Sequence, residues 1–201
     1  MDIAQTHYNW NILTYGMMLA WKSKIGELLA AKLNIEFKDL DDFLVEYLWV
    51  KDIWEFISDM TKEKWDSSQA WEEFWKVENK CLKILLWDDT HKLIAAWGRT
   101  IMYPPNRQLV RETQWLVRYY LEVDYDEQVR RAKIQTSEQL KNRPALQGLS
   151  DPQIDTMFER MQHDRSKIYT DFAEWNIYNT WWKFDFVVRK IYEHIMQPRK
   201  I

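Results

Sequence analysis

Bulky apolar side chains recur at three- and four-residue steps along most of this chain. In the first segment the apolar positions are Leu13, Met17, Trp21, Ile25 and Leu28. On a helix this spacing places all of them in one stripe that can face a core. We therefore predict a first helix from near Asn9 to Leu33, with Asn34 as its stop.

The same spacing predicts further helices along the chain. The capping-box spacing of Ser150 and Gln153 marks one helix start, because each side chain can satisfy the backbone donor of the other residue. That helix would be interrupted at Thr170–Asp171 or at Asn176–Asn179. The expected helices run from near Asp39 to before Asp66, from Ser68 to Leu86, from Asp88 or Asp89 to Gly98, from Asn106 through Leu121, and from Ser150 towards Ile191.

Turn residues are scarce, which argues against a sheet protein. The chain of 201 residues holds only four glycines and five prolines. A many-stranded sheet needs more turns than these residues can provide. We therefore expect an all-α fold, an irregular bundle of about six to eight helices with an aromatic-rich core. It would form a single helical domain over 1–201, with two packed halves, 1–102 and 107–201, as the alternative.

Composition also bears on the compartment. No stretch reaches the ~18 uninterrupted apolar residues of a membrane helix, and the amino terminus lacks the features of a secretory signal. The single cysteine, Cys81, cannot form an internal disulfide, which fits a reducing environment. We expect a cytoplasmic protein that does not enter a membrane.

Aromatic residues are the most distinctive feature of the composition. Tryptophan occurs 13 times, and aromatic residues make up 15% of the chain. Most of them would fill the core of the bundle; the alternative is that some anchor another protein, since tryptophan and tyrosine dominate interface anchors. Trp181 and Trp182 are adjacent, so they cannot both point along one line into the same core. With Tyr178 they form the predicted interface, and the partner would be another protein or a second copy of the chain.

Arginine is concentrated in the second half of the chain. Arg99 is the only arginine in the first hundred residues. The stripe formed by Arg107, Arg111 and Arg118 could contact an anion, because guanidinium groups offer a fork of donors. The alternative is a solvated helix surface with internal ion pairs. Since the net charge is −3, the sequence does not favour nucleic-acid binding.

Familiar catalytic and metal-binding motifs are not found. The Glu-x-x-His pairs of di-iron bundles are missing, and Asp88-x-x-His91 is more simply explained by a helix cap at Asp88. Cys81 lacks the spacing of a zinc site and is expected to be an inert packed thiol. No phosphate-binding loop, Rossmann glycine run or Gly-x-Ser-x-Gly elbow is found, and four glycines argue against a phosphate-cradling loop. We expect neither a metal nor a cofactor.

One short segment resembles a known family. Arg189 and His194, in the sequence Arg-Lys-Ile-Tyr-Glu-His, match the Arg-x(4–6)-His motif of HEPN-family helical ribonucleases. The resemblance implies that the pair handles the scissile phosphate and its attacking ribose hydroxyl, usually in a dimer. Lys190 departs from the polar residue that often follows the arginine. The alternative is that both residues lie exposed near the end of a helix and complement its dipole.

Three hypotheses for function follow. The first is a noncatalytic interaction or accessory subunit that packs on a larger protein or on itself through aromatic anchors. The alternative is a HEPN-like, metal-independent ribonuclease that uses Arg189 and His194. A third class is a small-molecule pocket lined by aromatic rings between helices.

Overall fold

A parallel sheet forms the centre of the molecule. The structure is a computed structural model, and it describes residues 10–197 except 65, 142 and 180–183. Its five strands are arranged in the order β2-β3-β1-β4-β5, and every neighbouring pair is parallel. The expected all-α bundle is therefore wrong. The strands are β1 (Asn11–Tyr15), β2 (Glu36–Asp39), β3 (Lys92–Ala95), β4 (Leu116–Glu122) and β5 (Trp175–Tyr178).

β1, β3 and β4 were missed at the level of sequence because most of their residues are buried on both faces of the sheet. All four residues of β3 are buried, and so are four of the five in β1. A strand covered by helices on both faces reads as a short apolar run without alternation, which periodicity cannot separate from a helix segment. The apolar positions Leu13 and Met17 thus belong to a strand and the loop after it, although their spacing also fits a helix.

Helices make up most of the remaining chain. The longest are α4 and α8, and two short 3-10 turns, η1 and η2, lie between longer elements. Their bounds are α1 (Lys22–Leu33), α2 (Leu40–Leu48), α3 (Ile53–Lys64), α4 (Ser67–Trp87), η1 (Thr100–Met102), α5 (Pro104–Glu112), α6 (Tyr125–Lys133), α7 (Ser137–Lys141), η2 (Pro144–Leu146), α8 (Asp151–Phe172) and α9 (Phe184–Met196).

Several predicted helix boundaries are confirmed. Asn34 ends α1 in a left-handed conformation, with its N–H bonded to the carbonyl groups of Ala30 and Ala31. The helix predicted over 68–86 is α4, and α8 begins directly after Ser150, whose N–H donates to Gln153 Oε1 at 2.8 Å. Local capping chemistry was therefore read correctly.

Other predicted helices are strands. The segment between Asp88 and Gly98 contains β3, and the helix predicted through Leu121 stops at Glu112 and is followed by β4. The predicted interruption at 176–179 contains most of β5. In β4 and β5 short runs of β-branched and aromatic residues pair in the sheet, and β3 is a short, fully buried run, Lys-Leu-Ile-Ala. In each segment the pairing outweighs the helix-like spacing.

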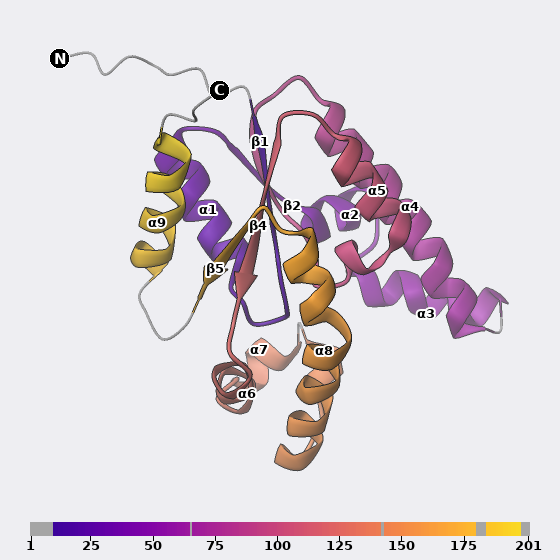
Figure 1. The fold of residues 1–201 in the computed structure, drawn as a ribbon. Helices are drawn as coiled ribbons and strands as arrows, with labels where there is room; N and C mark the ends of the chain where they lie inside the picture. Colours follow the sequence, from indigo (N-terminus) through magenta and orange to yellow (C-terminus); the bar gives the residue numbers. More distant parts are fainter. Residues whose placement is uncertain (1–9, 65, 142, 180–183, 198–201) are drawn as a thin grey trace.

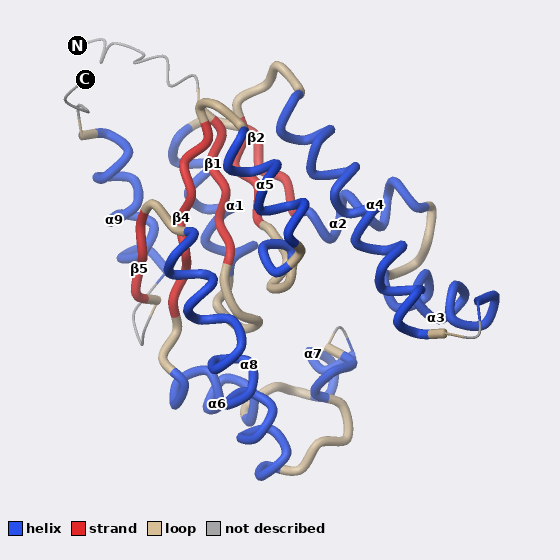
Figure 2. The backbone as a smooth tube through the Cα atoms, turned by 45° about the vertical axis from the view of Figure 1, so that its right-hand side comes forward, coloured by secondary structure: helices blue, strands red, loops and turns tan. Residues whose placement is uncertain are grey.

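Helices cover both faces of the sheet (Figure 1). Figure 1 separates α1 and α9 on one side from α4 and α5 on the other, and in the turned view α4 and α5 lie to the right of β1 and β4 (Figure 2). Side chains alternate along β1: Leu13 and Tyr15 pack with α4, α5 and α8, whereas Ile12 packs with α1 and α9. The sheet joins both halves of the sequence, because β1 pairs with β4 as well as β3. No helix within the described residues combines the length and apolar character needed to cross a membrane.

The carboxyl ends of the strands meet at one edge of the sheet. In Figure 1 this is the lower edge, beyond which α6 and α7 lie. The loops after β1, β2 and β3 meet there, because all strands run in the same direction. In open parallel sheets, ligands bind at this edge.

Candidate functional site

The loop between β1 and α1 has its carbonyl groups fixed by surrounding side chains. Residues 17–20 lie in this loop, and each of their carbonyl oxygens accepts a hydrogen bond from a side-chain nitrogen. The donors are Lys22 Nζ to Met17 O (3.0 Å), Gln128 Nε2 to Met18 O (3.0 Å), Arg131 Nη1 to Leu19 O (2.8 Å) and Asn179 Nδ2 to Ala20 O.

These bonds determine where the loop amides point. A trans peptide is planar, so its N–H is directed opposite to its carbonyl group. Leu19 and Trp21 have positive φ angles of 65° and 55°, which curl the loop. Successive amides that face one side of such a curl make a concave site for an anion, and the N-terminus of α1 adds its dipole. The loop is therefore built to hold an anionic group.

Two glycines allow the close packing of this loop. Gly16 has a φ of 152°, and a Cβ at this position would lie 2.5 Å from the Leu121 carbonyl oxygen. Only glycine can occupy this position without moving β4. A Cβ on Gly98 would lie 3.3 Å from the Gly16 carbonyl oxygen and 3.9 Å from Arg165 Nη1. The loop after β3 and helix α8 thus meet the loop after β1.

Lys22 is the first residue of α1 and reaches back to the loop. Its ammonium donates to Met17 O at 3.0 Å. Burial lowers the pKa of Lys22 to about 8, and the nearby Arg143 and Arg165 act in the same direction. Asp41 and Asp39 partly oppose this shift. An ammonium in these surroundings would be stabilised by an added anion.

Two aspartates lie at the carboxyl end of β2, at the same edge: Asp39 is its last residue and Asp41 lies in α2. Asp39 caps α2: its Oδ1 accepts from the N–H of Asp41 at 2.9 Å, and its Oδ2 accepts from the Ser23 hydroxyl. Asp41 Oδ1 is buried and has no hydrogen-bond partner among the described residues. Burial, and then the charge of Asp39, raises the pKa of Asp41 to about 8. Asp41 is thus a carboxylate with an unused acceptor and raised basicity.

Three arginines complete the charges at this edge. Among the described residues, no carboxylate lies within ion-pair distance of Arg99, Arg143 or Arg165. Burial lowers the pKa of Arg99 and of Arg143. The Arg99 guanidinium lies over the rings of Trp71 (5.8 Å) and Trp75 (5.5 Å). Such a cluster of cations without acidic partners is suited to a ligand that carries negative charge.

A buried glutamate supports the loop that carries Arg99. Glu78 of α4 accepts hydrogen bonds from Thr100 Oγ1 and Asn106 Nδ2, both at 2.7 Å. Burial raises the pKa of Glu78 to about 7, although both hydrogen bonds lower it. This network ties η1 and α5 to α4 and so fixes the position of Arg99.

The loop corresponds to a phosphate-binding motif with one departure. In G-x-x-x-x-G-K-[ST] the backbone cradles phosphates and the lysine reaches them. Gly16, Lys22 and Ser23 fit this pattern, whereas Trp21 replaces the second glycine. The loop is hard to recognise in the sequence because Trp21 stands where the motif has its second glycine. The available signal was a glycine directly after a buried apolar run, with Lys-Ser at the right spacing.

The residues predicted as a protein interface lie elsewhere. Tyr178 ends the edge strand β5 and is 58% exposed. Trp181 and Trp182 lie outside the described residues. The predicted interface therefore stays a prediction.

The three arginines predicted to contact an anion bind other residues of the protein and do not join the arginine cluster at the sheet edge. Arg107 donates from Nη1 to the carbonyl groups of Ile101 and Met102, both at 2.9 Å. Arg118 pairs with Glu174 at 2.9 Å, and the guanidinium of Arg111 lies 5.4 Å from the Phe172 ring centroid. Their predicted contact with an anion stays a prediction, whereas sequence reasoning missed Arg99, Arg143 and Arg165.

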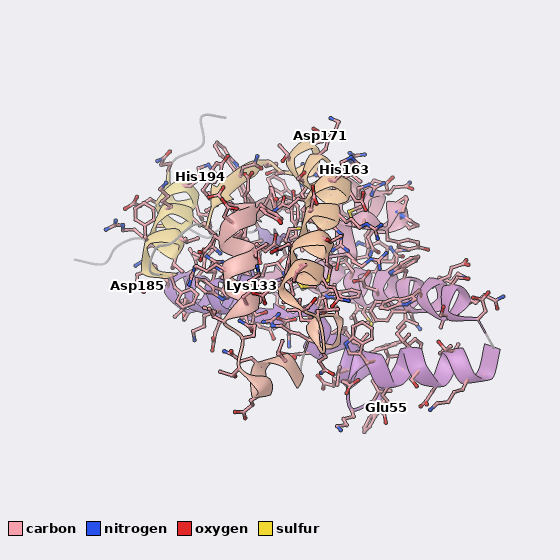
Figure 3. The ribbon with its side chains drawn as sticks, turned by 90° about the horizontal axis from the view of Figure 1, so that it is seen from below. Glu55, Lys133, His163, Asp171, Asp185 and His194 are labelled. Atoms are coloured by element: carbon pink, nitrogen blue, oxygen red, sulfur yellow. The ribbon has the colours of Figure 1, made fainter. Side chains whose placement is uncertain are left out.

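Arg189 and His194 do not form a joint site. Five positions apart at about 100° per residue, they point in different directions from α9. His194 Nδ1 lies 2.7 Å from the Tyr119 hydroxyl, and its ring contacts Trp175. Figure 3 shows His194 at the opposite end of α9 from Asp185. His194 is a packed residue of the sheet face, not a partner of Arg189.

Comparisons with known proteins agree on one family. The chain matches the sequence profile of shikimate kinase over residues 18–196. It is 30% identical over 164 residues to a shikimate kinase of Francisella tularensis subsp. holarctica, covering 82% of each chain. The solved shikimate kinase of Bacteroides thetaiotaomicron has a TM-score of 0.75 at 22% identity, covering 94% of this chain and 99% of that one. That of Acinetobacter baumannii, in complex with shikimate, has a TM-score of 0.74 at 23% identity, with 95% of each chain covered.

These matches correct the functional hypotheses. Both the noncatalytic accessory subunit and the HEPN-like ribonuclease are wrong, because the matched family is one of kinases. The first hypothesis failed because the departure at Trp21 hid the phosphate loop, and the second because a motif of two residues also occurs on an ordinary packed helix. The chain belongs to the shikimate kinase family.

Proposed function

We propose that this chain transfers a phosphoryl group from a nucleoside triphosphate to a hydroxyl group of a small carboxylated alcohol of the shikimate type. The observation that carries the proposal is the position of Asp41, whose buried Oδ1 has no partner among the described residues, close enough to the Lys22 ammonium beside an anion-binding loop for their charges to interact. The relatives of this chain are shikimate kinases, and their name gives the class of molecule that would accept the phosphoryl group.

Lys22 and the loop amides would hold the phosphates of the donor. Phosphoryl transfer depends mainly on positioning and on stabilising charge that spreads over the transferred group. The amides of Met18, Leu19 and Trp21 are directed away from the side chains that bind the loop carbonyls, so they can receive phosphate oxygens, whereas the Ala20 N–H donates to Met17 O at 3.3 Å. Lys22 would exchange its bond to Met17 O for a bond to phosphate, which restores the charge that burial disfavours.

Asp41 would accept the proton of the attacking hydroxyl group. A general base works best when its pKa lies near the working pH, and burial raises the pKa of Asp41 to about 8. Its unused Oδ1 can accept the hydrogen bond of the substrate hydroxyl. The oxygen then attacks the terminal phosphorus as the bond to the departing diphosphate breaks, and the proton remains on Asp41.

The arginine cluster would hold the carboxylate of the acceptor. Arg99 and Arg165 influence each other electrostatically, and neither has an acidic partner among the described residues. A guanidinium group binds a carboxylate through two parallel hydrogen bonds, which orients the substrate as well as attracting it. The cation–π contacts of Arg99 with Trp71 and Trp75 would restrict its guanidinium group for this role.

Residues at the site also fit a magnesium ion, which would accompany the triphosphate. Ser23 and Asp39 hydrogen-bond to each other and offer a hydroxyl and a carboxylate oxygen. Mg²⁺ prefers oxygen ligands and keeps several waters, so one carboxylate with phosphate oxygens is a sufficient site. The described residues hold no group of three His, Cys, Asp or Glu that could bind a metal, which agrees with such a shared site. When bound, the ion would neutralise charge on the phosphates; this replaces the expectation of a metal-free protein.

The test is a kinase assay with shikimate, ATP and magnesium, in which ADP release is measured. Wild type should show shikimate-dependent release, and Asp41→Asn should lower kcat by about 10²–10⁴-fold. Asp42→Asn is the matched control, since Asp42 is the exposed neighbour in the same helix, and it should keep near wild-type activity. Equal rates in both variants would remove Asp41 from the mechanism, and no release in wild type would overturn the proposed reaction.

Location and assembly follow as further parts of this proposal. The buried free thiol of Cys81 is suited to a reducing compartment, which supports the cytoplasm as the site of the reaction. A protein partner or a second copy of the chain would bind at the edge strand β5, where Trp175 and Tyr178 are exposed. Sedimentation of wild type and Tyr178→Ser at equal concentration would test this interface.

A further inference from the structure

Trp21 occupies the position at which the phosphate loop normally has a glycine. Glycine there permits close approach of the backbone to a phosphate and a left-handed conformation. Trp21 adopts that same conformation, with φ 55° and ψ 33°, at the start of α1. The chain therefore keeps the backbone of the loop and adds a large indole ring, in a conformation that disfavours any side chain.

The indole ring contacts a cation and a second aromatic ring. The Arg131 guanidinium lies 3.7 Å from the centroid of the Trp21 ring, and the Phe184 ring centroid lies 4.7 Å away at 59°. Arg131 itself is fully buried and fixed by hydrogen bonds to Glu127, Leu19 O and Asn179 O. Because these bonds do not involve the indole, the Arg131 guanidinium group would remain in place if the indole ring moved away.

A guanidinium group and an aromatic ring that both contact a flat nitrogen heterocycle would also hold a nucleotide base. The Arg131 guanidinium group adjoins the anion-binding loop, since its Nη1 donates to the carbonyl group of Leu19. Resting on the proposed function, we propose that the Trp21 indole takes the place of the base of the nucleoside triphosphate and must leave before the base can bind. Trp21 would thus set the affinity for the phosphoryl donor.

The size of this effect follows from competition between the Trp21 indole and the nucleotide base for the same place beside the Arg131 guanidinium group. The apparent affinity for a ligand falls by the fraction of molecules in which its place is free. A cation–π contact with a desolvated guanidinium, together with the Phe184 contact, makes the free state a minority of roughly one molecule in ten. Binding of ATP should therefore be about tenfold weaker than in a chain without the ring, whereas a ligand that has only phosphates should be unaffected.

The experiment compares two ligands and two tryptophan variants in the full chain. Trp21→Ala removes the ring but keeps a Cβ, and Trp49→Ala is its matched control, because Trp49 also has a positive φ (54°) and is 94% exposed. Calorimetry with magnesium-ATP should show about tenfold tighter binding to Trp21→Ala than to wild type. Tripolyphosphate, which lacks a base, should bind all three proteins equally, and Trp49→Ala should match wild type with both ligands.

The outcomes separate this inference from the proposed function. Unchanged or weaker ATP binding by Trp21→Ala, with tripolyphosphate still bound, would overturn the role of Trp21 alone. No binding of tripolyphosphate to wild type would overturn the phosphate-binding loop and the inference with it. If Trp21→Ala does not fold, wild type labelled with 5-fluorotryptophan serves instead, with Trp21→Leu used to assign the resonance. The Trp21 resonance should shift with ATP and not with tripolyphosphate, and a resonance that ATP leaves unmoved would overturn the inference.

Discussion

Arginines on the two sides of the phosphate loop are held in different ways. Arg131, towards β4 and β5, donates to Glu127, to Leu19 O and to Asn179 O, and it carries the Trp21 ring. Arg99 and Arg165, on the other side, have no acidic partner among the described residues. An arginine whose donors are satisfied by the protein maintains the loop, whereas one without an acidic partner is available to a ligand. The variants below test this difference.

The largest effect on stability is expected for Arg131→Ala. Removal of this buried guanidinium leaves two loop carbonyl groups without their donors and weakens a buried ion pair, at a cost of about 3 kcal/mol in the free energy of unfolding. Arg130→Ala removes the more exposed partner of the same glutamate and should cost about 0–1 kcal/mol. Urea denaturation measures both, and similar losses would show that the buried contacts of Arg131 are not special.

The next largest effect is expected for Lys22→Ala, which should lower the catalytic rate and leave the free energy of unfolding nearly unchanged. Loss of a cation that stabilises the transferred phosphoryl group should lower kcat by about 10²–10³-fold. Lys24→Ala is the control, because Lys24 lies on the same helix, is exposed and pairs only with Glu27 in the described contacts. Steady-state kinetics with saturating ATP measures both variants. A Lys22→Ala enzyme with wild-type kcat would remove the lysine from the phosphate site.

A smaller effect, confined to the acceptor, is expected for Arg165→Ala. One charge-assisted hydrogen bond to the substrate carboxylate would be lost, which should raise KM for shikimate by roughly 10- to 100-fold. KM for ATP should change far less. Arg160→Ala, exposed on the same helix α8, should leave both constants unchanged. A rise in KM for ATP but not for shikimate would place Arg165 on the donor side of the site.

The smallest effect is expected from the Glu78 network, which supports Arg99. The pKa of Glu78 is raised from its ordinary 4.5 to about 7, so the unfolded chain ionises first and the folded state loses stability as pH rises from about 4.5 to about 7. Glu78→Gln cannot ionise and should avoid this loss. The melting temperature of the variant, relative to wild type, should therefore rise by a few degrees between pH 5 and pH 8. A difference that is independent of pH would contradict the raised pKa.

Local chemistry was readable from the sequence, and pairing over long distances was not. Asn34 and Ser150 were recognised as helix boundaries because a cap involves only residues a few positions apart. The strand Lys92–Ala95 was read as a helix because its burial depends on β1 and β2, which lie far away in the sequence. Likewise Asp41, Glu78 and Arg165 carry no local signal, since each acquires its character from residues on other elements.

The sequence by itself determined where helices can start and stop, that a large aromatic core could form, and that Gly16 and Lys22-Ser23 stand at phosphate-loop spacing. The tertiary structure alone decided that three apolar runs would be buried strands and that Lys22, Asp41 and the arginines would meet at one edge of the sheet. The physical reason is that caps and turns follow from interactions between near neighbours, whereas burial, strand pairing and shifted pKa values arise only when distant segments pack together and exclude water.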